Sequence, residues 1–320
     1  MPLESPRTFP SPEADILLST YNGAAFLPEL LGSLEVQTFK GFRLLMRDDS
    51  STDDSLQILS SFAKKAPFEC LLLPSSGRLG TIESFNSLAA ASTAPFIMLC
   101  DQDDVWLPQK VERSISAIKS FMERRPQGAP ALAHCDLRVT DASLIALSDS
   151  HWRAQSLDAQ TRVSLPKTLM QNSVTGCASI FNRALAKAAF PVPQDAIMHD
   201  WFLAIAAAAF DGICPIPENL ILYRQHRSNS MGATDFSDPF SLARLLMKKS
   251  KTPRLGIDRP FIQAQAALHS IRGLTPESKA ILERFASIPR LGWIERRRAL
   301  LSGGFLKSGI LRNLGLLALI

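Results

Sequence analysis

The stretch PFIMLCDQDDVW, residues 95–106, decides the fold, because an apolar run there ends abruptly in acidic side chains. The apolar run behind Pro95 predicts a buried β-strand. Three carboxylates, Asp101, Asp103 and Asp104, lie within four positions. Like charges this close repel one another, and a hard divalent cation held by oxygen ligands relieves the repulsion. The stretch predicts a metal and phosphate site at the carboxyl end of a strand, although a solvated acidic turn carries the same residues.

Strands and helices alternate before this acidic stretch. Apolar runs at 15–19, 42–46 and 70–73 predict strands, and apolar residues at helical spacing follow each run. Beyond the acidic stretch, residues 174–181 and, last, 219–223 also predict strands. Such alternation is typical of βαβ units with a mostly parallel sheet. Loops at the strand ends then gather along one edge, where they can build a nucleotide site. Four polar clusters stand after predicted strands or before helices: Thr20-Tyr21-Asn22-Gly23, Asp48-Asp49, Arg78 to Gly80, and Asp101 to Asp104.

The composition is that of an ordinary globular protein. The 320 residues are 46% apolar and 20% charged, which allows one large domain or two modest ones. Five cysteines lie apart without a C-x-x-C pair, as expected for reduced thiols in the cytoplasm. We expect residues 1–13, rich in proline and polar side chains, to be a flexible N-terminus and not a signal peptide. The longest uncharged apolar stretch, 201–210, is too short to cross a bilayer.

Charge is distributed unevenly along the chain. Residues 241–320 hold 15 basic and 4 acidic residues, a balance of +11, and the other 240 hold 20 basic and 26 acidic, a balance of −6. We therefore predict a domain over 14–236 and a basic helical region over 237–320. The arginine, leucine and tryptophan residues of this region favour binding to an anionic membrane surface. We therefore expect the protein to lie peripherally on the inner face of the cell membrane. The region lacks a nucleic-acid-binding module, so we expect no nucleic acid as partner; a pair of solvated helices is the alternative.

The motifs, taken in order, resemble the inverting glycosyltransferases of the family-2 type, which have the GT-A fold. The resemblance covers about residues 14–232. It implies an α/β fold with a mostly parallel, Rossmann-like sheet flanked by helices and followed by the basic helical C-terminal region. The motifs that carry it are STYNG at 19–23, DD-x-S-x-D from 48 and DQDDVW at 101–106; NSVTGCASIFNR at 172–183, HDW at 199–201 and YRQH at 223–226 resemble the bacterial rhamnosyltransferase branch.

The resemblance implies a substrate class and a cofactor. The donor is a nucleoside-diphosphate sugar, with dTDP-L-rhamnose favoured and UDP-galactose, UDP-glucose or UDP-GlcNAc as alternatives. The acceptor is a saccharide or a lipid-linked saccharide of a cell-surface polysaccharide, such as an O-antigen. Mg²⁺ or Mn²⁺ bridges the diphosphate, and the anomeric carbon is inverted. Pocket selectivity depends on a few side chains that the sequence does not place.

The resemblance implies roles in donor binding for five residues. Thr20 and Tyr21 line the pocket for the base and ribose, and Asn22 belongs to the same turn. Asp48 accepts a hydrogen bond from a ring N–H of the base. Arg78 lies near the base or the diphosphate, although the glycines around it depart from the family's usual Asn-x-Gly.

Six more residues are candidates for binding the metal or the substrates, or for the chemistry. Asp103 binds the metal, Asp101 faces the ribose or the metal, and Asp200 at a helix start is the general base that inverting transfer requires. Gly176 suggests a close approach of the backbone to the donor sugar or acceptor, with core packing an equally good account. His226 follows the last predicted strand and approaches the phosphates or metal, unless it is an ordinary loop histidine. His199, beside Asp200, is an orienting partner or a surface histidine.

Two other classes compete with a glycosyltransferase. Asp101, Asp103 and Val105 also resemble the haloacid-dehalogenase pattern, in which the first aspartate is a phosphorylated nucleophile. The motif here follows three strands, and Asp104 stands in place of the usual glycine, which disfavours that class. A non-catalytic, membrane-associated scaffold with a degenerate nucleotide site is the second alternative, and the intact acidic residues argue against it.

Overall fold

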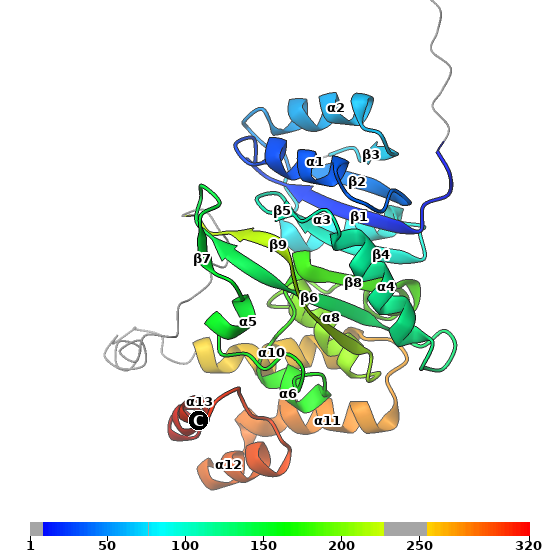
Figure 1. The fold of residues 1–320 in the computed structure, drawn as a ribbon. Coiled ribbons are helices and arrows are strands. Elements are labelled where there is room, and N and C mark those ends of the chain that lie inside the picture. The colour runs from blue at the N-terminus through cyan, green and yellow to red at the C-terminus, as the bar shows by residue number, and fades with distance from the viewer. Residues whose placement is uncertain (1–8, 76, 227–254) are drawn as a thin grey trace, which may run out of the picture.

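The computed structural model describes residues 9–75, 77–226 and 255–320. One nine-stranded sheet, with helices on both faces, organises the chain, and its strand order is β3-β2-β1-β4-β8-β6-β9-β5, with β7 paired to β6 (Figure 1). None of the helices in these residues is long and apolar enough to span a membrane. The predicted boundary between 236 and 237 falls outside the described residues, as do residues 1–8 of the predicted flexible N-terminus.

The first half of the sheet is parallel, as the alternation predicts. Strands β1 to β4 pair in parallel in the order β3-β2-β1-β4, and the helices α1 to α3 connect them. The helix α4 follows the acidic stretch. The elements are β1 (Ala14–Thr20), α1 (Leu27–Glu35), β2 (Phe42–Asp48), α2 (Ser55–Lys65), β3 (Cys70–Leu72), α3 (Thr81–Ala91), β4 (Phe96–Asp101), β5 (Val105–Trp106) and α4 (Lys110–Met122).

The second half of the sheet is mixed. Strand β8 (Ser179–Asn182) runs antiparallel to β4 and to β6 (Leu132–Thr140). Strand β9 (Ile213–Arg224) is parallel to β6 and antiparallel to β5. The polar connection between β6 and β8 holds β7 (Ala146–Ser148), α5 (His151–Ala154) and α6 (Leu165–Met170).

One strand prediction is wrong at its start. The sequence predicts a strand over 174–181, but Gly176–Ala178 form a 3₁₀ turn, η1, ahead of β8. Pairing with β4 ends at Met98 and Ile180. The chain before Ile180 turns away from the ladder, and the Ser179 hydroxyl donates to the Gly176 carbonyl at 2.7 Å. A tight turn therefore replaces the extended chain where Gly176 passes the sheet edge.

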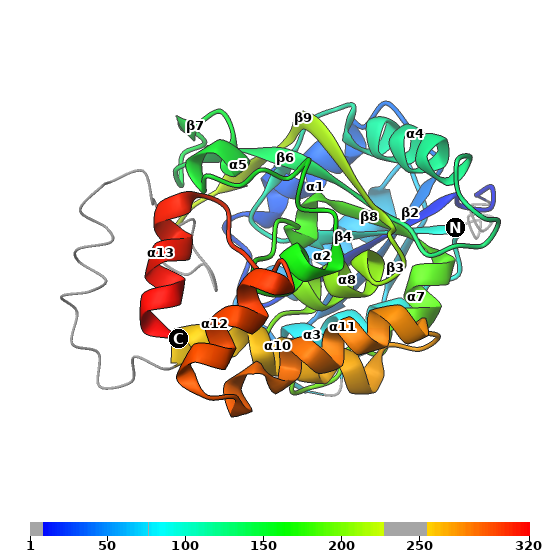
Figure 2. The same cartoon turned by 90° about the horizontal axis from the view of Figure 1, so that it is seen from below.

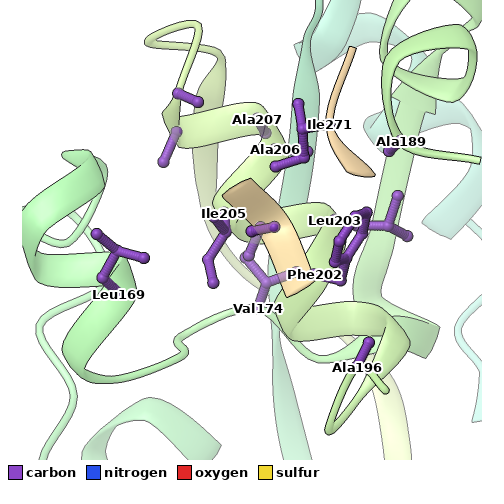
Figure 3. Packing of buried hydrophobic residues seen from close by; sticks show 14 of the residues in the cluster. Leu169, Val174, Ala189, Ala196, Phe202, Leu203, Ile205, Ala206, Ala207 and Ile271 are labelled. Atoms are coloured by element: carbon purple, nitrogen blue, oxygen red, sulfur yellow. The ribbon is translucent and has the colours of Figure 1, made fainter. Parts of the chain in front are cut away.

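The two faces of the sheet bury separate hydrophobic clusters. Alternate residues of a strand point to opposite faces, so Leu17 and Leu99 belong to one cluster and Ile16 and Cys100 to the other. The first cluster includes the helix α8 (His199–Ala208), which is apolar on nearly every side and packs between other helices and the sheet. Figure 3 shows its side chains with Leu169, Val174, Ala189, Ala196 and Ile271 around them.

The C-terminal region is helical, as predicted, but it is not a detached tail. Phe261 and Phe285 are buried in the same cluster as Phe202 of α8. The Ser278 hydroxyl donates to the Ala209 carbonyl at 2.6 Å at the end of α8. These helices therefore complete the core beneath α8 (Figures 1 and 2). The C-terminal helices are α10 (Leu255–Ser270), α11 (Pro276–Ser287), η2 (Ile288–Arg290), α12 (Trp293–Ser302) and α13 (Ile310–Leu319). The remaining helix, α7 (Arg183–Ala189), precedes α8 in the chain.

Candidate active site

The carboxyl ends of the parallel strands bring Thr20, Asp48 and Asp101 to one edge of the sheet. Thr20 stands opposite Asp48, and Ser19 opposite Asp101, in the strand register. The Thr20 hydroxyl donates to Asp48 Oδ1 at 3.2 Å, and the Ser51 backbone N–H donates to Asp48 Oδ2 at 2.9 Å. A carboxylate oxygen has two lone pairs, so Asp48 Oδ2 retains the capacity to accept a further hydrogen bond, such as one from a base.

Gln102 clamps the turn after β1 to the acidic stretch. Its Oε1 accepts from the Tyr21 backbone N–H at 2.8 Å, and its Nε2 donates to the Tyr21 carbonyl at 3.1 Å. A Cβ at Gly23 would lie 2.4 Å from Gln102 Oε1, so the turn requires glycine there. Asn22 adopts φ +49°, and its Oδ1 accepts from the Thr52 N–H at 2.8 Å. The clamp joins the turn around Tyr21 to the loop that carries the acids; sequence reasoning missed it.

Arg78 lies against the same turn. Its guanidinium carbon is 3.9 Å from the centre of the Tyr21 ring, a cation–π geometry. Asp49 holds the loop of Arg78, because it accepts from the backbone N–H groups of Leu79 at 2.6 Å and Gly80 at 2.8 Å. Sequence reasoning grouped Asp49 with Asp48, but the two neighbours face different partners. The structure thus places Arg78 with the other residues expected to bind the donor.

Negative charge accumulates at the end of β4. Burial, together with the charges of Asp103 and Asp200, raises the pKa of Asp101 to about 7. Asp104 is 1% exposed, and its Oδ2 has no hydrogen-bond partner among the described residues. Carboxylate oxygens of Asp101 and Asp104 and the Cys177 sulfur lie within 4.8 Å of one another. This arrangement of acids can hold a divalent cation.

His226 contacts the acidic loop from the end of β9. Its Nε2 lies 2.8 Å from Asp103 Oδ2, and its ring stacks on Phe26 with 4.5 Å between ring centroids. Arg224, which precedes it, donates from Nε to the Asp103 carbonyl at 2.9 Å and from its backbone N–H to Asp104 Oδ1 at 3.3 Å. Imidazole and carboxylate groups are common metal ligands. Arg224 lies in the YRQH motif, yet sequence reasoning did not assign it a role.

Asp200 lies in the first turn of α8. Its Oδ1 accepts from the Trp201 backbone N–H at 2.5 Å. Burial raises its pKa to about 6, although hydrogen bonds from Trp201 and Gly176 favour the ionised form. Its charge also raises the pKa of Asp101, so the two carboxyl groups interact. A carboxylate with a pKa near 6 is ionised at neutral pH and basic enough for general base catalysis.

Gly176 and His199 form the wall beside Asp200. A Cβ at Gly176 would lie 3.2 Å from His199 Nε2 and 3.5 Å from the Asp200 Cβ, so only glycine fits without displacement. His199 stacks on Phe85 with 4.6 Å between centroids, and burial lowers its pKa to about 4. The alternative of a surface histidine is wrong, since the side chain is buried and neutral. The helix start faces inward here because α8 is covered by other helices.

Comparison with known proteins agrees with this architecture. Two solved structures share the fold at 15% identity: S. aureus TarS 1-349 in complex with UDP-GlcNAc (TM-score 0.56, covering 91% of this chain and 79% of that one) and the mannosyltransferase PcManGT from Pyrobaculum calidifontis in complex with GDP-Man and Mn²⁺ (TM-score 0.57, covering 92% and 73%). The fold is therefore of the GT-A type.

A family model matches the first part of the chain. Residues 15–123 match the model described as glycosyl transferase family 2. An uncharacterized glycosyltransferase of Nostoc sp. is 23% identical over 224 residues, which cover 67% of this chain and 65% of the relative. The dTDP-rhamnosyl transferase RfbG of Shigella flexneri is 25% identical over 256 residues, which cover 76% and 79%. The chain thus spans about two thirds to four fifths of these relatives.

Proposed function

We propose that this protein transfers L-rhamnose from dTDP-L-rhamnose to a saccharide or lipid-linked saccharide, with inversion at the anomeric carbon. The observation that carries the proposal is the gathering of Thr20, Asp48, Asp101 and Asp200 at one sheet edge. The rhamnose donor is supported by the name of the Shigella relative and by the motifs of the second half of the chain. UDP-galactose, UDP-glucose and UDP-GlcNAc are the alternative donors.

Donor binding is assigned to the turn after β1 and the loops beside it. Asp48 retains an acceptor position for a ring N–H of the base. Tyr21 and Arg78 form a stacked pair that offers one flat apolar surface and one positive charge. A guanidinium recognises phosphate well, so Arg78 suits the diphosphate and Tyr21 the base or ribose. Asn22 fixes the turn through its hydrogen bond to Thr52.

Mg²⁺ or Mn²⁺ fits the acids at the end of β4. Asp101 and Asp103 supply carboxylates, and His226 supplies a ring nitrogen beside Asp103. Burial and the charges of Asp101 and Asp103 raise the pKa of Asp104, and a cation bound among these acids would relieve their mutual repulsion. A bound cation would neutralise charge that develops on the leaving diphosphate. The Mn²⁺ in the Pyrobaculum structure agrees with this assignment.

Asp200 is assigned as the general base. Inverting transfer needs one group to take the proton of the acceptor hydroxyl while that oxygen attacks the anomeric carbon. Asp200 interacts with Asp101, at the end of the strand where the donor diphosphate is expected. Gly176, whose backbone N–H stabilises the Asp200 carboxylate, lets the backbone pack closely there, since an added Cβ would lie 3.5 Å from the Asp200 Cβ.

We also propose that the enzyme works at the inner face of the cell membrane, in the synthesis of a cell-surface polysaccharide such as an O-antigen. The +11 balance of residues 241–320 supports attraction to anionic lipid. All five cysteines are unpaired, which suits a reducing compartment. A lipid-linked acceptor would explain why a glycosyltransferase carries such a charge.

A thermal-shift screen tests the donor. The protein is heated with dTDP-L-rhamnose, UDP-galactose, UDP-glucose, UDP-GlcNAc or no ligand, each with Mg²⁺, with Mn²⁺ or with chelator. A donor present at 100 times its Kd stabilises the native state by about 2.7 kcal/mol, a shift of several degrees. We expect the largest shift with dTDP-L-rhamnose and metal, and we expect Asp103→Asn to lose the metal-dependent part. A larger shift with any UDP-sugar would reject the rhamnose donor, and no shift with any sugar nucleotide would reject the site.

A further inference from the structure

Exposed apolar side chains concentrate on the last two helices. Seven of the fifteen large apolar side chains that are exposed in the described residues lie on α12 and α13, which together hold 20 residues. A soluble surface normally scatters such side chains singly, and their gathering marks an interaction site. They are Trp293, Ile294, Leu301, Ile310, Leu311, Leu314 and Leu319.

Helix α13 is apolar on both of its sides. Leu316 and Ile320 are 7% exposed and pack against the protein. Ile310, Leu311 and Leu314, which are 79%, 69% and 59% exposed, lie on the opposite arc of the helix. The inner face is thus already used for packing, and the outer face is left to solvent. Figure 2 shows α13 on the outside of the molecule, next to α12.

Positive charge surrounds the start of α13. Arg162 is 3% exposed, its guanidinium donates to the Ser308 hydroxyl at 3.3 Å, and its Nε has no hydrogen-bond partner within the described residues. Burial lowers the pKa of Lys307, and the positive charges of Arg312 and Arg162 lower it further. Asp158 is the carboxylate that faces Arg162. The N-terminal end of a helix adds a partial positive charge, so this place favours an anion.

Trp293 extends the same pattern to α12. Its side chain is 67% exposed, and the Arg297 guanidinium lies 3.8 Å from its ring centre. Arg297 also donates to the Ile320 carbonyl at 3.2 Å, which ties the start of α12 to the end of α13. Residues 288–320 hold six basic residues and one acidic residue, a balance of +5. Tryptophan and arginine together are enriched where a protein meets the headgroup layer of a membrane.

We propose that the outer face of α13 docks on an anionic bilayer, with Ile310, Leu311 and Leu314 inserted among the acyl chains. Lipid phosphates then lie at the cations around the helix start. The charge balance is the reason to choose a lipid surface over a second copy of this chain, because two copies would bring equal positive charges together. This inference rests on the proposed membrane location and names the surface responsible for it.

The test uses the whole 320-residue chain with point substitutions, because α10 and α11 fill the core and their removal would open it. Binding is measured by co-sedimentation with vesicles of phosphatidylglycerol and phosphatidylcholine, and with phosphatidylcholine alone. The variant Ile310→Gln/Leu314→Gln is compared with Ile145→Gln/Leu147→Gln, whose side chains are 65% and 62% exposed by the β7 hairpin. Both pairs are on the surface, so both variants should fold, which the thermal midpoint checks.

We expect the parent and the β7 control to bind phosphatidylglycerol vesicles alike and the α13 variant to need at least about tenfold more lipid, since two large aliphatic side chains remain in water. Raised salt should weaken parent binding several-fold. Equal binding by the α13 variant, or equal binding of the parent to neutral vesicles, overturns the proposal. So does a concentration-dependent dimer, seen by light scattering, that the α13 substitutions abolish without changing vesicle binding. Donor-induced thermal shifts should be the same in all variants, so failure here is distinguishable from failure of the donor site.

Discussion

Replacing Asp200 by asparagine should raise the stability of the protein while it lowers turnover. Burial raises the pKa of this carboxyl from 3.8 to about 6, so the folded state holds its proton more tightly than the unfolded state does. Ionisation therefore costs stability as the pH rises from 4 to 6, and the cost is complete above pH 6. A difference of about two pKa units corresponds to roughly 3 kcal/mol. Asp200→Asn should gain up to that amount at pH 8, less what solvent screens, and nothing near pH 4.

Turnover should change in the opposite direction. An amide has nearly the shape of the carboxylate and cannot take a proton, so the rate should fall about 10²–10⁴-fold while donor affinity persists. In the parent, activity should fall as the pH drops through 6, where Asp200 becomes protonated, and this limb should vanish in the variant. Loss of the Asp200 charge should also lower the pKa of Asp101, which that charge helps to raise to about 7.

Initial rates of sugar transfer, donor titrations and urea unfolding at pH 4.5 and pH 8 measure these effects. Asp195→Asn is the matched control, because Asp195 is an exposed aspartate in the loop before α8. It should alter neither stability nor rate. The reasoning is refuted if Asp200→Asn retains turnover within a few-fold of the parent, or if it is less stable than the parent at pH 8.

Three further substitutions test the packing, the buried ion pair and the metal assignment of the site. Gly176→Ala should destabilise the protein by roughly 1–3 kcal/mol and slow transfer, because the added Cβ would lie 3.2 Å from His199 Nε2. The control Gly32→Ala in α1, where the added Cβ meets open space, should not destabilise the protein. Thermal unfolding compares the two variants. Arg47→Ala should lower the free energy of chemical unfolding by about 3–5 kcal/mol, because it leaves the buried Asp49 carboxylate, 2.6 Å away, without its charged partner. The control Arg138→Ala, which removes an exposed ion pair, should leave stability near that of the parent. Asp103→Asn should abolish metal-dependent transfer without unfolding, and full activity of this variant in chelator would contradict the metal assignment.

The sequence was sufficient for the parallel half of the fold and its edge. Residues at the ends of adjacent parallel strands become neighbours whatever the loops do, so Thr20, Asp48 and Asp101 could be grouped from strand positions alone. Roles that depend on where a loop side chain turns could not be predicted. Asp48 and Asp49 are adjacent and chemically identical, yet one faces Thr20 and the other holds the Arg78 loop.

The burial of individual polar side chains was the second property that the sequence did not predict. His199 was open to two interpretations because a histidine at a helix start is usually solvated, whereas burial lowers the pKa of this one to about 4, with Phe85 stacked on its ring. Lys110 begins a helix, where a lysine is normally exposed, but it is fully buried with its Nζ 3.7 Å from the centre of the Trp106 ring. The charge of the C-terminal region could be read from the sequence. The packing of α10 and α11 in the core could not, because the apolar residues that anchor them resemble those of any amphipathic helix.

The burial of Phe261 and Phe285 with Phe202 bears on how this protein can be re-engineered. Asp200 stands at the start of the helix whose body these phenylalanines support. A hybrid that exchanged the C-terminal helices for those of a relative would therefore repack the underside of α8 and shift the proposed base along with the proposed membrane-facing surface. Acceptor choice and attachment to the bilayer would have to be exchanged together, as one piece with their shared core, or α8 would need compensating changes at the seam.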